Sequence, residues 1–229
     1  MQGPTLDPDR FSSLLSLVRT RTEQAQLGAA MNALQHLRSL SLDAAQQTVL
    51  SVAAQALQAA LAAACSQVVQ SLCQGEVLSS CDEVARLLAD GQPFVQPVLA
   101  ESLLLAGVAG DLLRAPVRDD RPWPVPPPLA KDRAVRVRLR DGVQVGRIVD
   151  SRSDQVTVRL QGKAGVTFPT VAVVALEPVE ATPAEAIEMG FAALHAGNAL
   201  LARLWLAAAG LRGSGPLPER GLQLAAVLR

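Results

Sequence analysis

A proline-rich segment divides this chain into two regions with different hydrophobic periods. Six of the thirteen residues from 116 to 128 are proline. Proline lacks an amide hydrogen and has a fixed φ, so repeated proline excludes a helix and favours an extended spacer. Before this segment apolar residues recur at the 3.6-residue spacing of helices, and after it they alternate at every second position. We therefore expect a helical bundle over 1–115, a linker over 116–130 and a β-structured part beyond it.

The first 115 residues predict four helices joined by short links, which is typical of a small bundle. Asp7 is expected to be the N-cap of the first helix, with Pro8 at its first helical position. The apolar spacing continues this helix toward Leu37. The other expected helices run from Ser41 or Asp43 to Gly75, from Ser79 or Ser80 to Gly91, and from Pro93 to Ala115.

The second expected helix is uncharged from Ala44 to Gly75. Gln67, Gln70 and Gln74 lie on one side, which is typical of an amphipathic packed helix and not of one surrounded by lipid. The opposite side is a narrow apolar stripe of Leu50, Leu57, Leu61, Val68 and Leu72. Such a helix lies at the centre of the bundle or is shared between subunits. Self-association through the helix around Leu50–Leu72 is therefore one expectation, and no membrane partner is expected.

The segment 131–179 predicts a small five-stranded β-barrel. Val135, Val137 and Leu139 alternate with arginines, and Asp141-Gly142 is a tight-turn signal. The expected strands are 134–140, 143–150, 156–160, 166–168 and 173–176. This rhythm over 134–178 resembles the SH3-like and Tudor-like barrels, with an Sm-like barrel as the alternative. The resemblance implies a closed barrel, and its short sequence suggests that a flanking helix supports the core.

Residues 180–229 predict a helical hairpin and a terminal helix. Thr182, Pro183 and Glu185 form a capping-box pattern. The stretch of about 184–213 resembles a single tetratricopeptide helical pair, with glycines and second-helix small and large residues at matching positions and departures at Ala193 and Pro216. The matching positions are Gly190, Gly197, Ala202, Leu206 and Ala209. The predicted fold class is thus α+β, with a helical bundle, an SH3-like barrel and a C-terminal helical hairpin.

Few residues suggest catalysis or metal binding. His36 and His195 are the only histidines, and neither has metal-ligand spacing. Cys65, Cys73 and Cys81 are eight residues apart, which matches no zinc module and favours buried, inert thiols. The segment 161–165 contains a Gly-Lys pair without the rest of a phosphate-binding loop. We expect no enzyme activity and no catalytic, cofactor or metal site.

The expected barrel has one chemically notable face. Arg136, Arg138 and Arg140 share one side of the first strand, and Arg147 and Arg159 lie on neighbouring strands. The stretch 131–178 has nine basic and five acidic residues, a net charge of +4. These five arginines are the candidate site for nucleic acid or an acidic partner, and a solvated strand face is the alternative. Arg121, Pro124 and Pro127 also fit a proline-motif ligand, although a plain spacer has the same composition.

Composition and the N-terminus suggest the compartment. The net charge is zero, so no global field attracts nucleic acid or an anionic membrane. The first residues lack the pattern of a secretory signal, and three cysteines fit a reducing compartment. The scarcity of Lys, Ile and Asn suggests a GC-rich, bacterial genome. We expect a cytoplasmic, non-enzymatic adaptor that binds another protein, with a nucleic-acid-binding module as the alternative.

Overall fold

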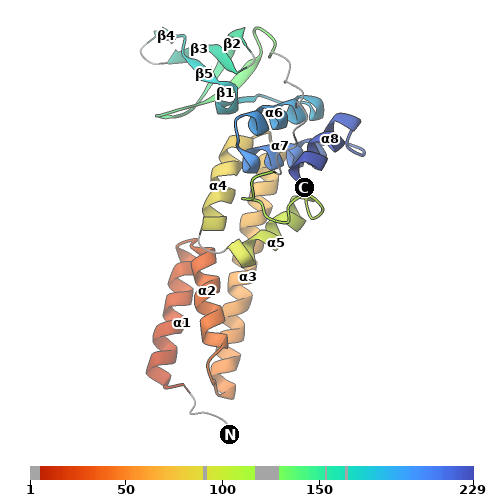
Figure 1. Ribbon diagram of the computed structural model, residues 1–229. Coiled ribbons are helices and arrows are strands. Elements are labelled where there is room, and N and C mark those ends of the chain that lie inside the picture. Colours follow the sequence, from red (N-terminus) through yellow and green to blue (C-terminus); the bar gives the residue numbers. More distant parts are fainter. Residues whose placement is uncertain (1–5, 90–91, 117–128, 153, 163–164) are drawn as a thin grey trace. The chain divides into compact units, whose positions relative to one another are not determined.

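The computed structural model describes residues 6–89, 92–116, 129–152, 154–162 and 165–229 (Figure 1). The described chain is α+β, with eight helices and one antiparallel sheet. It divides into two compact units. The first comprises 1–68 and 83–102, and the second comprises 69–82 and 103–229. The expected domain boundaries at 115, 130 and 179 stay predictions, and most of the expected linker lies outside the described residues.

The first unit begins with two helices where the sequence predicts one. α1 (Pro8–Glu23) starts as expected, since the Asp7 carboxylate accepts a hydrogen bond from the amide of Arg10 at 3.1 Å. The helix then ends in a turn at Ala25, whose φ is +56°, and α2 (Leu27–Arg38) follows. α1 packs against α2, and α2 also contacts α5 (Gln92–Ser102). The helical spacing of apolar residues continues through this turn, so the sequence pattern does not reveal it. The turn forms because Ala25 adopts the left-handed conformation.

The long uncharged helix is α3 (Ala44–Cys73), and its apolar stripe is buried within the chain. Leu57 and Leu72 have no exposed surface, and Leu50, Leu61 and Val68 are also buried. In the described part of the chain, α3 is the one helix long and apolar enough to cross a membrane. A third of its most apolar 18-residue window is buried inside the chain. A core helix of a soluble protein can have the same length and composition, so this finding alone does not assign α3 to a membrane.

The next two helices differ from expectation at their ends. α4 (Val77–Ala89) begins before Ser79, so neither Ser79 nor Ser80 is its cap. α5 ends at Ser102 instead of Ala115. Leu104 has a φ of +56°, and residues 103–115 form turns. Leu103, Leu105 and Leu112 are still buried, Leu112 fully, because the turns pack into the second unit, whereas Leu104 and Leu113 are exposed.

The second unit contains one six-stranded antiparallel sheet, and the prediction of a closed barrel was wrong. The strand order is β4-β3-β2-β1-β6, with β5 also paired to β3. The strands are β1 (Ala134–Leu139), β2 (Gly142–Ser151), β3 (Gln155–Gly162), β4 (Gly165–Thr167), β5 (Thr170–Ala172) and β6 (Leu176–Pro178).

The sheet stays open because its last strands are short and interrupted. β4, β5 and β6 have three residues each. Closure of the barrel would require β4 or β5 to pair with β6, and neither does. The 3₁₀ turn η1 (Val173–Ala175) follows β5 directly, where the sequence predicts a strand. η1 contacts both β1 and α6 (Pro183–His195), so a helix supports this side of the sheet.

The core face of the sheet carries the expected alternating apolar residues. Val135, Val137, Val156 and Val158 have no exposed surface, and Ile148 is also buried. Gly146 of β2 lies in the same register, opposite Val135 and Leu160. A Cβ at Gly146 would lie 2.8 Å from the carbonyl oxygen of Arg159, so the close approach of β3 requires glycine there.

The C-terminal helices of the second unit agree with prediction. The capping box at Thr182 is formed, and α6 packs against α7 (Ala199–Arg212). Gly197 has a φ of +74° in the turn between them. α8 (Glu219–Leu228) packs on both helices, and a Cβ at Gly190 would lie 2.5 Å from a methyl group of Leu224. Gly190 therefore allows close helix packing, as expected, but toward the terminal helix.

Candidate functional site: the outer face of the sheet

Two arginines of the predicted ladder bind residues of the turn after α3 and of the first turns of α4. The guanidinium of Arg136 donates to the carbonyl of Gly75 at 3.2 Å. Arg138 donates to the carbonyl of Leu78 and forms an ion pair with Asp82 at 2.8 Å. Because these bonds join β1 to the turn after α3 and to the start of α4, Arg136 and Arg138 anchor the sheet within the second unit.

Glu177 completes this anchor from β6. Its Oε2 accepts a hydrogen bond from the amide of Leu78 at 2.8 Å, and its Oε1 lies 3.4 Å from Arg136. The residue is 1% exposed. Burial raises the pKa of the Glu177 carboxyl, and the bonds to Leu78 and Arg136 oppose that shift. The carboxylate thus occupies the first turn of α4, where an anion is favoured by the helix dipole.

The other three arginines of the candidate set are exposed. Arg140 and Arg159 make no hydrogen bond or ion pair within the described part of the chain. Arg147 donates to the carbonyl of Asp132 at 2.9 Å, which uses one of its five N–H groups. The structure therefore separates the ladder into two anchoring residues and three solvent-facing ones.

Arg147 and Arg159 are directly opposed across β2 and β3. The pairing of β3 with β4 and β5 places Phe168 opposite Arg159, between the pairs Leu160–Thr167 and Thr157–Thr170. One row of side chains on the outer face therefore reads Arg147, Arg159, Phe168. Two like charges in direct cross-strand pairing destabilise a sheet unless an anion or solvent screens them.

Next to the anchoring Arg136, which pairs with Val145 across β1 and β2, a second row on the same face is mostly apolar. Val145 lies opposite Gln161 by the same register, and Gln161 pairs with Val166. Val145 is 64% exposed, Val166 53% and Phe168 58%. Val143, two residues before Val145, is 46% exposed. We call the six residues of these two rows, with Val143, the outer face: Val143, Val145, Arg147, Arg159, Gln161, Val166 and Phe168.

The exposed valines and Phe168 were not among the residues predicted from the sequence. A strand that alternates Val with Gln or Gly does not reveal which set faces the core. The two-residue hairpin at 140–141 sets the register, because it pairs Arg138 with Val143. Val143 and Val145 must then share the outer face with Arg147. The hairpin position in the sequence was the signal that could have identified this face.

The histidines and cysteines do not form a site. His36 and His195 are both exposed. Cys65 and Cys81 are buried, whereas Cys73 is exposed, so the expectation of three buried thiols was wrong for Cys73. Burial raises the pKa of Cys65, and it raises that of Cys81 to about 11. Among the residues that the structure describes, no group of three or more His, Cys, Asp or Glu could hold a metal ion.

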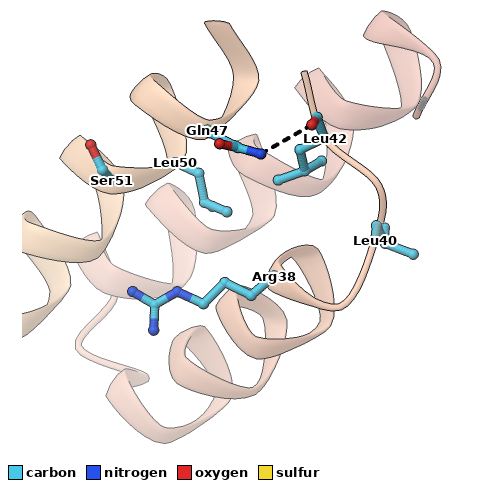
Figure 2. A pocket seen from close by; sticks show the side chains of 6 residues that line it. All are labelled: Arg38, Leu40, Leu42, Gln47, Leu50 and Ser51. Atoms are coloured by element: carbon cyan, nitrogen blue, oxygen red, sulfur yellow. Dashed lines mark hydrogen bonds between the residues drawn. The ribbon is translucent and has the colours of Figure 1, made fainter. Parts of the chain in front are cut away.

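One surface pocket lies in the first unit, between the end of α2 and the start of α3 (Figure 2). Its volume is about 280 Å³, and it is lined by Arg38, Leu40, Leu42, Gln47, Leu50 and Ser51. Gln47 donates to the carbonyl of Leu42 at 3.2 Å. Arg38 is its one ionisable side chain, and the lining contains no acid–base pair.

Comparison with known proteins adds no family to this description. No protein-family model, curated protein or solved structure matches the chain significantly. The resemblances to SH3-like and tetratricopeptide folds therefore stay predictions from the sequence. Arg121, Pro124 and Pro127, the possible proline-motif ligand, lie outside the described residues.

Proposed function

We propose that this chain is a non-enzymatic, cytoplasmic adaptor that binds another protein through the outer face of its sheet. The observation that carries the proposal is the exposure of Val145, Val166 and Phe168 beside Arg147 and Arg159. The solvent side of an antiparallel sheet is normally polar. Aromatic residues and arginine are enriched at the centres of protein interfaces.

The distribution of arginine contacts supports this assignment. Arg136 and Arg138 serve the fold, whereas Arg159 has no partner within the described residues. Glu177 pairs with Arg136 across β1 and β6, and its carboxylate is buried and accepts a hydrogen bond from Leu78, so it does not neutralise Arg147 or Arg159. The cations of the outer face therefore remain available to an external anionic group.

Affinity capture from native lysate tests the proposal with matched variants. We expect the wild-type chain to retain a stoichiometric protein partner, and the double variant Arg147→Glu with Arg159→Glu to lose it. Arg152→Glu reverses one charge at an exposed position after β2 and should retain the partner. Recovery of the same partner by all three proteins would place the interface elsewhere, and recovery of bait alone would contradict the adaptor function.

A nucleic-acid-binding module is the second candidate, favoured by the position of Phe168 beside the Arg147–Arg159 pair. A base could stack on Phe168 while the guanidinium groups contact phosphate. Titration of labelled single-stranded oligonucleotides at low and moderate salt tests it. Changing both arginines to Gln would reduce the log–log salt slope by about 1.4 if each neutralises one phosphate. Absence of binding at low salt would exclude this candidate.

A further inference from the structure

We propose that the outer face binds an extended protein segment that has an acidic residue at one position and an apolar residue two positions along. This inference rests on the proposed function and names the chemistry of the partner. It follows from the order of side chains on the face, in which a cationic row lies beside an apolar row.

The spacing of the two rows matches the repeat of an extended chain. Arg147 and Val145 are two residues apart on β2, and Arg159 and Gln161 are two apart on β3. Two residues of a strand span about 7 Å, so the rows are separated by that distance. Alternate side chains of an extended peptide have the same separation. A peptide aligned with β2 and β3 would therefore place one side chain over each row.

The charge of the first row selects a carboxylate. Adjacent strands lie about 4.8 Å apart, so the backbones of Arg147 and Arg159 are close enough for both side chains to reach one anionic group. Arg147 is held by the carbonyl of Asp132, while Arg159 makes no ion pair in the described chain. A carboxylate between them would relieve the like-charge pairing and accept charge-assisted hydrogen bonds.

The second row selects an apolar neighbour. Val145 and Val166 are more than half exposed, and Gln161 between them has no charge. Phe168 extends the apolar surface at the end of the cationic row. Valine offers no π-face for base stacking, and single-stranded nucleic acid is usually held by several aromatic residues. The composition of the face therefore favours a protein segment over an oligonucleotide.

Fluorescence anisotropy with synthetic peptides tests this partner chemistry. The main probe has three repeats of Asp-Ser-Val-Ser, which places the acid and the apolar residue two positions apart. The matched probes replace Asp with Lys, or Val with Ser, and a fourth probe is a labelled single-stranded oligonucleotide. We expect the full-length protein to bind the main probe at low salt, and each matched peptide at least about tenfold more weakly.

Protein variants separate the two rows. Arg147→Gln with Arg159→Gln should reduce the affinity for the main probe about tenfold and reduce the salt dependence of binding. Val145→Ser with Val166→Ser should also reduce the affinity for the main probe but leave the salt dependence of binding unchanged. Arg152→Gln is the control and should bind like wild type. Thermal unfolding of each variant shows whether the sheet is intact, and the valine pair tests the site if the arginine pair perturbs folding.

Three results would overturn the inference: equal binding of the Lys probe, equal binding of the Ser probe, or tighter binding of the oligonucleotide. Failure of every peptide to bind would also overturn it. If lysate capture still depends on Arg147 and Arg159 in that case, the adaptor function stands and only the partner chemistry is wrong. If capture also fails, both proposals are wrong.

Discussion

At the scale of single residues, the polar side chains of the second unit bind the backbone more often than they bind one another. Arg136 donates to Gly75, Arg138 to Leu78, and Glu177 accepts from the amide of Leu78. The bond from Leu78 to Glu177 satisfies an amide group that the N-terminal end of a helix leaves without an intrahelical partner. Glu177 therefore replaces the serine caps expected for α4, and it comes from a strand 99 residues away in sequence.

The buried Glu177 carboxyl predicts a specific pH dependence of stability. Its pKa is raised by burial, so the folded chain binds the proton more tightly than the unfolded chain. Its contribution is therefore fully present below the ordinary Glu pKa, and is lost as the pH rises through the raised value. Glu177→Gln cannot titrate, so the stability of this variant relative to wild type should increase with pH across that window.

Denaturant unfolding at several pH values measures this difference. The fluorescence of Trp205, which is fully buried in α7, reports on the second unit in a Trp123→Phe background. Glu219→Gln, at an exposed position, is the control and should follow wild type. A constant difference between Glu177→Gln and wild type at all pH values would contradict the prediction.

The three cysteines should react at very different rates. Cys73 is exposed, whereas Cys65 and Cys81 are buried and have raised pKa values. The thiolate is the reactive form, so a buried thiol with a raised pKa reacts slowly. We expect one fast equivalent with a thiol reagent at mildly alkaline pH in the native chain, three after denaturation, and no fast equivalent in Cys73→Ser. Three fast equivalents in the native chain would contradict this assignment.

At the scale of elements, α3 has apolar residues on both its buried and its exposed side. Its apolar stripe is buried within the chain, as expected for a helix at the centre of a bundle. The exposed side carries Val49 and Val52 among small and uncharged residues. Self-association through α3 stays a prediction. Because the apolar stripe is buried, a second copy would have to contact this exposed side.

Sedimentation velocity over a range of concentrations tests self-association. Two uncharged faces can meet without like-charge repulsion, so we expect the apparent mass to increase with concentration. Val52 is 58% exposed, and Val52→Lys should keep the chain monomeric without changing its fold. Leu17→Lys makes the same kind of change at an exposed position of α1 and should behave as wild type. A monomeric wild-type chain at every concentration would contradict the prediction.

At the scale of the whole molecule, long-range contacts define the second unit. Arg203 of α7 is 1% exposed and donates to the carbonyls of Arg114 at 2.6 Å and Leu228 at 2.8 Å. Burial lowers the pKa of its guanidinium, and the charge of Asp111 opposes that effect. One side chain thus joins the turns after α5, the helical hairpin and the C-terminal end of α8.

Removal of the Arg203 side chain should destabilise the second unit. Arg203→Met leaves buried carbonyls without a donor, so we expect the free energy of unfolding to fall by about 2–4 kcal/mol. The Trp205 signal in the Trp123→Phe background gives this quantity from denaturant unfolding. Arg19→Met, at an exposed position of α1, should change it by less than about 0.5 kcal/mol. Equal stabilities of the two variants would show that the Arg203 contacts are energetically neutral.

The sequence by itself determined the elements whose signals are local. The cap at Asp7, the capping box at Thr182, the turn at Gly197 and the alternating strands after Ala134 all appear where residue type and spacing predict them. These features depend on neighbours within a few positions, so short-range chemistry is sufficient. The α+β class followed from the change of hydrophobic period.

Only the tertiary structure decided which residues are available for binding. Arg136, Arg138 and Arg140 are equivalent in the sequence pattern, but Arg136 anchors the sheet to the turn after α3 and Arg138 to the start of α4, whereas Arg140 is exposed. The open sheet, the turn after Ser102 and the exposed valines of β2 depend on partners distant along the chain. Register and long-range packing place these side chains, and a periodic pattern contains neither.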